Sequence, residues 1–510
     1  MNLTIVLLVL AFLFSLFFLQ RWFIKSRRMN KQSNNLLPPS PPTLPLLGNL
    51  HQIGELMHHS LRDLSQKHGP VMLLYVGQVP FLVVSSRAMS EEVMKTHDVV
   101  FANRPALTAV KILVYDCVDV GFGPCNEKWR QLRKICVMEL LSVAMRVKTF
   151  KQTREEEVAC MVEKISRSAS VGAPVNLTEM LMSVFMNILC RCVLGRKYDV
   201  ERDEGYGYLI RVLTTETPPF VFGDVFPSLG WLDAITGSVR KLKLTASRID
   251  SFLEQIIKEH EQHRKGHDVP DEEKDFVDLM LQVQVEENKR MKNDFTRDNM
   301  KALLVDLFFA GSATTSTVPE WAMSEMIKQP KILQKAQEEV RRVVAEKGKK
   351  KVEEEDIQEM NYLKCVVKET LRMHPPMPTL LPRQTSEGVK LGGYRIPAKT
   401  NVMVNVWAIQ RDPDVWSRAE EFIPERFMSA SPDFKGNDFE FVPFGAGRRI
   451  CPGMGFGMAV VESKLANLLY WFDWELPGGA PKEGLDMTEQ LGHVASRKTP
   501  LNVVAIPHFN

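Results

Sequence analysis

The residues best suited to chemistry lie in one glycine-rich loop around a single cysteine. The loop reads Phe441-Val-Pro-Phe-Gly-Ala-Gly-Arg-Arg-Ile-Cys451-Pro-Gly453, and an apolar run of helical pattern, Met454 to Leu469, follows it directly. Pro452 suits the first turn of a helix, because its missing N–H has no intrahelical partner there. This order predicts that Cys451 lies at a helix N-terminus, where free N–H groups and the helix dipole favour a metal-binding thiolate.

The glycines and one arginine of this loop indicate a large, flat partner. Gly445, Gly447 and Gly453 allow the backbone to approach such a partner closely. Arg449 lies two residues before the cysteine and could bind a carboxylate on that partner. A lone cysteine is just as often a buried structural residue, so the cysteine alone does not decide between the two interpretations. The complete pattern favours a cofactor site.

The pattern Phe444-x-x-Gly447-x-Arg449-x-Cys451-x-Gly453 resembles the haem-binding signature of the cytochrome P-450 monooxygenases. The resemblance implies that Cys451 is the axial thiolate ligand of the iron of haem b and donates electron density that favours O–O cleavage. The loop residues implied in haem binding are Phe444, Gly445, Arg449, Cys451 and Gly453.

A second informative stretch, Met300 to Lys328, has apolar residues on all sides and is predicted to be a buried central helix. Gly311 and Thr314 lie three residues apart near its centre and therefore share a face. A glycine costs stability in a buried helix, so it indicates that another group approaches closely. The resemblance implies that Ala310 and Gly311 lie against haem and dioxygen. It also implies that Thr314 is catalytic and guides protons to dioxygen.

This helix departs from the family pattern beside the threonine. The family has an acidic residue there, whereas this chain has Ala313. Proton supply is therefore expected to come from ordered water or from a hydroxyl group on the substrate. Pro319 lacks the N–H that would bond the Thr315 carbonyl, which predicts a kink or a loosened turn.

Trp129 and Arg133 lie four residues apart and share one face of a predicted helix. On spacing alone, a solvent-exposed basic helix is the simpler interpretation. In the resembled family, this Trp-x-x-x-Arg pair hydrogen-bonds a haem propionate, for which the planar guanidinium is well suited. Arg383 is implied to make a similar contact. Arg130 and Lys134 would then face outward on a docking surface.

Glu369 and Arg372 can pair on one face of the helical run Tyr362–Met373, where an ordinary exposed pair is worth about 0.2–0.5 kcal/mol. Because Pro424-Glu-Arg426-Phe follows, the resemblance implies a structural triad of Glu369, Arg372 and Arg426 that fixes the segment carrying the cysteine loop. It also implies a substrate pocket lined by Leu307, Ala310, Thr379, Leu380, Leu381, His493 and Val494. For His493, a buried histidine with satisfied hydrogen bonds is an equally good interpretation.

The N-terminal residues predict a membrane anchor. Leu3 to Leu19 is almost continuously apolar and long enough to cross or nearly cross a bilayer. Five basic residues follow between Arg21 and Lys31 and are expected to stay cytosolic. The run lacks the small-residue cleavage site of a secretory signal. We expect a membrane anchor helix at residues 1–20, a basic and proline-rich linker at 21–50, and one haem-thiolate catalytic domain at 51–510.

Charge and cysteine content bear on the partners and the compartment of the protein. The 510 residues carry a net charge of only +3, which gives no support for nucleic-acid binding, and eight cysteines without paired spacing indicate a reducing compartment.

The aromatic stretch Thr217–Leu232 predicts a contact with a ligand, a partner or the membrane. In the resembled family this region roofs the substrate pocket and dips into the bilayer.

The resemblance covers essentially the whole chain and is strongest to the microsomal plant enzymes of the A-type clan. It implies the mainly α cytochrome P-450 haem-thiolate fold with a minor β region. It also implies insertion of one oxygen atom of O2 into a hydrophobic specialised metabolite. The glycine pairs of the cysteine loop lack the third glycine of a dinucleotide fingerprint. NADPH is therefore expected to act through a separate NADPH–cytochrome P-450 reductase in the endoplasmic reticulum membrane, with cytochrome b5 as a second candidate partner.

The apolar residues implied for the pocket favour a terpenoid substrate, with alkaloids and phenolics as alternatives. Two other functional classes remain at this point. One is a haem-thiolate isomerase or dehydratase that needs no reductase, against which Thr314 argues. The other is a non-catalytic haem- or ligand-binding protein.

Overall fold

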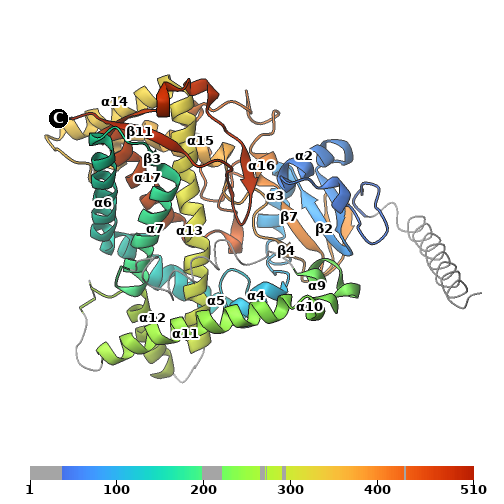
Figure 1. Ribbon diagram of the computed structural model, residues 1–510. Helices are drawn as coiled ribbons and strands as arrows, with labels where there is room; N and C mark the ends of the chain where they lie inside the picture. Colours follow the sequence, from blue (N-terminus) through green and yellow to red (C-terminus); the bar gives the residue numbers. More distant parts are fainter. Residues whose placement is uncertain are drawn as a thin grey trace, which may run out of the picture.

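The long helix α13, Arg297–Lys328, passes through the middle of the molecule, and other helices pack around it (Figure 1). The computed structural model describes residues 37–197, 221–264, 270–271, 273–289, 295–429 and 432–509. The predicted anchor at residues 1–20 lies outside this part of the chain, as do residues 217–220 of the aromatic stretch. Helices predominate and strands are short, which confirms the expected mainly α fold with a minor β region.

Apolar residues on every side explain the central position of α13. Its buried residues range from Met300 to Ile327 and occupy all faces. Thr296 caps the N-terminus by accepting a hydrogen bond from the Asn299 N–H. The helix continues on both sides of Pro319. Within the described residues, α13 and α7 (Leu177–Leu194) are long and apolar enough to cross a membrane, but both are 61% buried inside the fold.

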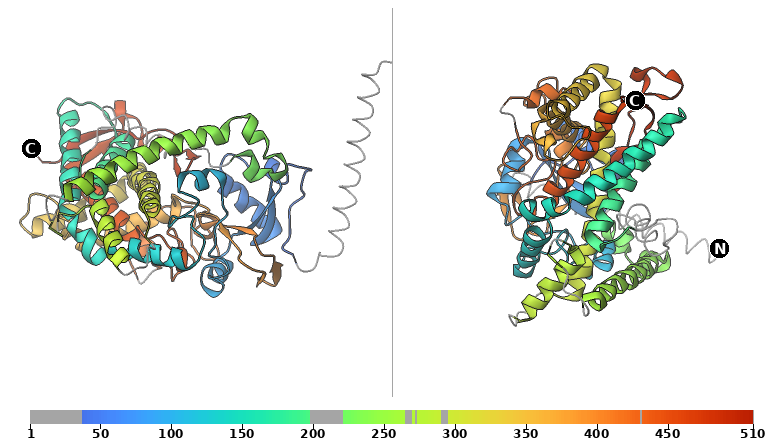
Figure 2. Two further views of the ribbon diagram at one scale, coloured as in Figure 1. Left: turned by 90° about the horizontal axis from the view of Figure 1, so that it is seen from below. Right: turned by 90° about the vertical axis from the view of Figure 1, so that its left-hand side faces the viewer.

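The helices α7, α15 and α17 contact α13 directly, and α11 lies along one side of the molecule against α4 (Figure 2). The helical bounds are α2 Met57–His68, α3 Arg87–Glu91, α4 Thr108–Leu113, α5 Glu127–Ile135, α6 Lys151–Ser170, α9 Phe222–Val225, α10 Leu232–Ile235, α11 Ser238–Arg264, α12 Phe276–Lys289, α14 Pro330–Glu346, α15 Asn361–Met373, α16 Val406–Ile409 and α17 Met454–Trp471.

The largest sheet has the strand order β1-β2-β7-β4, with β2 and β7 parallel and the other two pairs antiparallel. A three-stranded sheet has the order β3-β11-β8, and β5–β6 and β9–β10 each form an antiparallel pair. The bounds are β1 Val71–Val76, β2 Val79–Val84, β3 Val175–Asn176, β4 Arg383–Gln384, β5 Val389–Leu391, β6 Tyr394–Ile396, β7 Asn401–Val404, β8 Phe472–Glu475, β9 Glu489–Leu491, β10 Ala495–Arg497 and β11 Asn502–Pro507.

The described part of the proline-rich segment belongs to the folded body. The Leu73 N–H of β1 donates to the Pro39 carbonyl over 2.9 Å. Asn49 is fully buried, and its side chain accepts a hydrogen bond from the Tyr75 N–H at 2.8 Å. These bonds satisfy backbone N–H groups at the edge of β1. The folded catalytic body therefore includes residues that precede the expected boundary at residue 51.

The three residues of the expected triad meet in the structure. Glu369 and Arg372 are both fully buried on α15, with Arg372 Nε 2.7 Å from Glu369 Oε2. Arg426 Nε lies 3.0 Å from Glu369 Oε1. Arg372 also donates to the carbonyls of Gln410 and Ala419, over 2.9 and 2.8 Å. The triad thus ties α15 to the irregular segment that leads into the cysteine loop.

Candidate functional site

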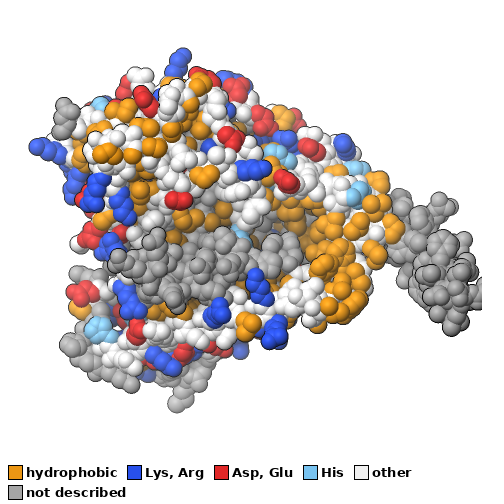
Figure 3. All heavy atoms as spheres, in the orientation of Figure 1, with side chains coloured by type: hydrophobic (Ala, Val, Ile, Leu, Met, Phe, Trp, Pro, Cys, Tyr) orange, Lys and Arg blue, Asp and Glu red, His pale blue; other side chains and the backbone are white. Residues whose placement is uncertain are grey.

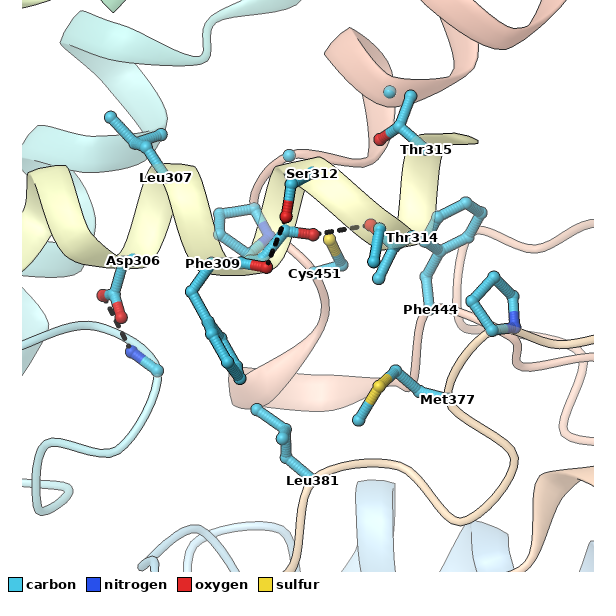
Figure 4. Close-up of a pocket in the computed structure, with 18 of the residues that line it drawn as sticks. Asp306, Leu307, Phe309, Ser312, Thr314, Thr315, Met377, Leu381, Phe444 and Cys451 are labelled. Carbon is cyan, nitrogen blue, oxygen red and sulfur yellow. Dashed lines mark hydrogen bonds between the residues drawn. The ribbon is translucent and has the colours of Figure 1, made fainter. Parts of the chain in front are cut away.

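An internal cavity lies between the middle of α13 and the cysteine loop, and its wall is mostly apolar. Figure 4 shows Phe309, Met377 and Leu381 around this space, and Cys451 and Thr314 also belong to its lining. The apolar lining includes Leu307, Phe309, Met377, Leu380, Leu381 and Val494. An apolar cavity of this kind admits a hydrophobic molecule and excludes water.

Cys451 is placed by a loop that closes on itself before α17 begins. The Cys451 N–H donates to the Phe444 carbonyl over 3.0 Å, and Phe444 also lines the cavity. The helix starts at Met454 with Gly453 as its cap, so Pro452 precedes the first turn and the prediction that it lies within that turn is wrong. The expected anion-favouring contacts are nevertheless present, because the N–H groups of Gly453 and Met454 point at the sulfur.

The polypeptide alone does not make Cys451 a thiolate. Burial raises the pKa of its thiol, and the hydrogen bonds from Gly453 and Met454 and the charge of Arg133 offset this effect only in part. The sequence had indicated a thiolate environment from the helix terminus alone, which neglected the cost of desolvating a charge. A coordinated cation would supply the missing stabilisation of the anion.

Gly445 and Gly447 are required by the backbone conformation of the loop itself, in addition to any approach of a partner. Gly447 has φ +67°, and a Cβ there would lie 2.3 Å from the Met94 carbonyl oxygen. Gly445 has φ +70°, which L side chains rarely adopt. Their small size therefore serves the chain's own turn and its packing on Met94. Gly453, in contrast, has open space beside its α-carbon, as close approach of a partner requires.

A cluster of arginines borders the cavity, with Asp98 and Asp119 as nearby anions. Burial and mutual repulsion lower the pKa values of Arg104 and Arg449, the latter to about 10. Arg383 lies 3.4 Å from Asp98, and Arg449 donates to the carbonyls of Ala102 and Val120. The side chains give this end of the cavity an excess of positive charge.

Trp129 and Arg133 on α5 belong to the same cluster. Trp129 Nε1 donates to the Val120 carbonyl over 3.0 Å, and Arg133 Nη2 lies 2.5 Å from the Ile450 carbonyl. The Arg449 guanidinium stacks 4.0 Å from the centre of the Trp129 ring. The predicted propionate-binding residues Trp129, Arg133, Arg383 and Arg449 therefore lie together, with their donors now bonded to carbonyls or Asp98.

These features match the chemistry of haem b. A flat apolar ring requires apolar walls, its two propionates require cations at one edge, and its iron requires an axial ligand. The cavity offers apolar walls, the arginine cluster at one end and the Cys451 sulfur. The donor set thus fits the group that the cysteine motif implies.

The cavity face of α13 carries Ala310, Ala313 and Thr314, as the helical spacing predicted. Thr314 Oγ1 donates to the Ala310 carbonyl over 2.5 Å, which leaves its oxygen able to accept a hydrogen bond (Figure 4). Gly311 also lines the cavity, and close approach of a cofactor to it stays a prediction. A Cβ at Gly311 would meet the ring of Phe185 on α7 at 3.2 Å, so the glycine lets α7 and α13 pack together.

A pair of buried carboxyl groups, Asp119 and Asp306, was missed by the sequence interpretation. Asp306 Oδ2 accepts hydrogen bonds from the Val120 and Gly121 N–H groups over 2.9 and 3.2 Å. Burial and repulsion from Asp119 raise the pKa of Asp306 well above its usual range, and burial also raises the pKa of Asp119. Two carboxylates this close disfavour the ionisation of both at once.

The predicted pocket residues Leu307, Ala310, Leu380, Leu381, His493 and Val494 all line the cavity. The described lining lacks Thr379, whose contact with a substrate stays a prediction. The chain turns at this point, with the Leu380 N–H donating to the Met377 carbonyl over 3.0 Å, and brings residues 377, 380 and 381 to the wall. His493 lies edge-on to Phe309, with ring centres 5.4 Å apart.

Comparison with known proteins gives one consistent family. A family model described as Cytochrome P450 matches residues 38–502. A phenylacetaldehyde oxime monooxygenase of Prunus mume is 48% identical over 511 residues, covering 99% of this chain and 95% of that protein. A 5-epiaristolochene 1,3-dihydroxylase of Nicotiana tabacum is 44% identical over 504 residues, covering 98% and 97%.

The fold is also similar to that of solved cytochrome P450 structures. A zebra fish cytochrome P450 solved with progesterone superposes with a TM-score of 0.75 at 24% identity, covering 88% of this chain and 99% of that chain.

Proposed function

Because the chain belongs to the cytochrome P450 family and is a monooxygenase, we propose that it oxidises a terpenoid within plant specialised metabolism. The observation that carries this proposal is the apolar cavity beside Cys451, whose wall offers few polar groups to anchor a substrate. The dihydroxylase relative named for 5-epiaristolochene supports it.

Haem held by a cysteine thiolate activates dioxygen, so that one oxygen atom enters a C–H bond and the other leaves as water. In this chain Cys451 provides the thiolate, and the cluster of Trp129, Arg133, Arg383 and Arg449 binds the propionates. Apolar side chains from α13 and the β9–β10 turn orient the substrate and exclude water.

Thr314 holds a proton at Oγ1 on the cavity side of α13. Its hydroxyl donates to the Ala310 carbonyl, and its free lone pair accepts from a water molecule or from a substrate hydroxyl. Ala313 offers no acid, so the proton supply to Thr314 runs through ordered water or the substrate. This arrangement makes the coupling of electron use to product depend on what fills the cavity.

A basic or phenolic substrate is the second candidate, and Asp306 is the observation that favours it. Its carboxyl group is a polar point in an otherwise apolar wall and could accept a hydrogen bond from an ammonium or hydroxyl group. The two backbone N–H groups that it already holds leave limited capacity for a ligand. For this reason the terpenoid proposal is preferred.

A membrane-bound NADPH–cytochrome P-450 reductase supplies the electrons in this proposal, with cytochrome b5 as an additional donor. Arg130 on α5 is 54% exposed and Lys134 follows one turn later, which supports docking of an acidic partner on this face.

The endoplasmic reticulum membrane is the proposed location, with the catalytic body in the cytosol. Exposed apolar residues support contact with the bilayer at the side where the described chain begins (Figure 3). Three lie in the proline-rich segment and the others follow residue 220: Leu44, Leu46, Leu47, Phe222, Trp231 and Ile235. The turn between β1 and β2 connects the two groups: Gly48 forms a β-bridge with Val76, and the Gln78 N–H donates to the Val225 carbonyl over 2.9 Å.

The proposal is tested in microsomes that contain the protein and the reductase. A panel of sesquiterpenes, basic alkaloids and phenolics is incubated with and without NADPH, and products are identified by mass spectrometry. Oxygenated sesquiterpenes formed only with NADPH support the proposal. Oxidation confined to amines or phenols, abolished in Asp306→Asn while hydrogen exchange of the Val120 and Gly121 amides is unchanged, transfers the assignment to the second candidate.

A further inference from the structure

Two adjacent histidines and a glutamate form a compact cluster away from the cavity. His58 and His59 lie in the first turn of α2, and Glu489 begins β9. The sequence separation between the two elements exceeds 400 residues, so the fold alone brings the side chains together. One potential ligand atom from each residue lies within 4.8 Å of the other two.

The distances within this cluster resemble those around a tetrahedral metal ion. His58 Nε2 lies 3.1 Å from Glu489 Oε1, and His59 Nε2 lies 3.6 Å from Glu489 Oε2. Ligand atoms bound to zinc at about 2.0–2.2 Å are separated by roughly 3.3–3.6 Å in a tetrahedron. The two contacts involve different oxygens of Glu489, so one ion between the rings would be held by both oxygens, or the rings would move closer to one of them.

The nitrogen atoms that face the carboxylate are not used elsewhere in the described part of the chain. His58 is fully buried; its Nε2 and the Nε2 of His59 contact Glu489 without good hydrogen-bond geometry, and its Nδ1 has no hydrogen-bond partner there. A buried imidazole without a partner is costly. A metal ion would bind one nitrogen of each ring and the carboxylate at once.

The surroundings hold the rings in position and leave one side open. His59 stacks on Trp407 with ring centres 4.1 Å apart, and its side chain is 38% exposed. Two neighbouring arginines oppose a cation, but both pair with Glu420: Arg62 Nη1 at 3.0 Å and Arg411 Nε at 3.3 Å. The exposed side provides an entry path and room for water as a fourth ligand.

We propose that His58, His59 and Glu489 bind a divalent transition-metal ion, with zinc the best match to two imidazoles and one carboxylate. The site is separate from the cysteine loop. The ion links α2 to the β9–β10 pair, whose connecting turn carries His493 and Val494 in the cavity wall. It therefore fixes the position of a segment that contacts the substrate.

A second cluster in the same molecule, His260, Asp275 and Asp278, provides a matched control. His260 Nδ1 already lies 2.8 Å from the Ile256 carbonyl, and Nε2 lies 2.8 Å from Asp275 Oδ2. Both nitrogens of this imidazole are engaged in hydrogen bonds. This second cluster is thus similar in composition, but the hydrogen bond and charge of Asp275 raise the pKa of His260 to about 8, which favours the protonated ring that cannot bind a metal.

The test uses the full-length haem-loaded protein in detergent, purified with a tag that contains no histidine. The protein is incubated with zinc chloride, freed of unbound metal and analysed for zinc and iron by mass spectrometry. A competing chromophoric chelator gives the Kd for zinc. The variants are His59→Gln and Glu489→Gln, with His260→Gln as the control, and an unchanged haem absorption spectrum shows that each is folded.

We expect about one zinc ion per iron in the wild type, and a Kd for zinc weakened at least about tenfold in both cluster variants but unchanged in His260→Gln. X-ray absorption at the zinc edge should show two nitrogen ligands at about 2.0–2.1 Å. The proposal is overturned if the folded wild type retains no zinc. It is also overturned if His59→Gln binds zinc as tightly as the wild type, or if the control loses as much as the cluster variants.

Discussion

Replacing Glu369 by glutamine should weaken the fold far more than replacing a comparable surface glutamate. Glu369 is fully buried and accepts four hydrogen bonds. Arg372 donates two of them, at 2.7 and 2.8 Å, and the Ile423 N–H and Arg426 Nε donate the others, at 2.7 and 3.0 Å. Glutamine keeps the shape but removes the charge that balances Arg372.

The expected loss follows from breaking one partner of a buried ion pair, which costs about 3–5 kcal/mol. With an unfolding entropy of about 2.1 cal/mol/K per residue, a body of roughly 470 residues loses about 1 °C of melting temperature for each kcal/mol. Glu369→Gln should therefore lower the melting temperature by about 3–5 °C.

Glu346→Gln is the matched control. Glu346 pairs with Arg342 on the surface of α14, where the side chains are 60% and 58% exposed, and an exposed pair four residues apart contributes only about 0.3–0.5 kcal/mol. Both variants are heated at one scan rate while far-ultraviolet circular dichroism and haem release are followed. Equal shifts for Glu369→Gln and Glu346→Gln would refute the view that the triad locks the segment before the cysteine loop.

Four further outcomes are expected. Cys451→Ser should abolish the red-shifted Soret band of the reduced, carbon-monoxide-bound protein, and a band that persists would contradict thiolate ligation by this residue. Thr314→Ala should consume NADPH while releasing peroxide in place of product, because positioned proton transfer is worth about 10²–10⁴ in rate; Ala313→Asp should change product formed per NADPH much less. Burial lowers the pKa of His260, but the hydrogen bond and charge of Asp275 outweigh it and raise this pKa to about 8. Its stabilisation is thus present below pH 6.5 and lost as the pH rises through 8, so His260→Gln should cost about 1–2 kcal/mol in the free energy of unfolding at pH 6 and little at pH 9. Removal of residues 1–35 should leave measurable flotation with liposomes at low salt, and a wholly soluble protein would contradict membrane contact by the apolar surface of the body.

Most of the correct sequence-based predictions rest on short patterns of neighbouring residues. The apolar pattern of residues 300–328, the four-residue spacing of Trp129 and Arg133 and the short Glu369–Arg372 motif each depend on neighbours along one helix. Such patterns are fixed by helical periodicity, and the structure places those residues on the expected elements. The cysteine loop was recognisable because its whole pattern lies within thirteen residues.

Contacts between distant segments could not be derived in this way. Val120 and Asp306 are separated by 186 residues, and an acid on a helix predicted to be apolar all round gave no sign of its partner. Arg104 reaches the Leu381 and Pro382 carbonyls, 277 and 278 residues away. The contact that a side chain at Gly311 would make with the ring of Phe185 on α7 was likewise not visible in the sequence. Each of these contacts depends on how distant segments pack together in the fold, which the local sequence pattern does not reveal.

The loop over one end of the cavity shows why polar side chains occur in an apolar wall. Its backbone groups near Val120 have no regular ladder, yet Asp306 accepts the Val120 and Gly121 N–H groups, while Trp129 and Arg449 donate to the Val120 carbonyl. Each such group left unpaired in the interior would cost about 1–3 kcal/mol. The residues that border the cavity therefore also hold its roof in place. A substitution at Asp306 must then alter the shape of the cavity together with its polarity, so its effect on substrate choice is interpretable only beside a measurement of the loop itself, for example hydrogen exchange of the Val120 and Gly121 amides.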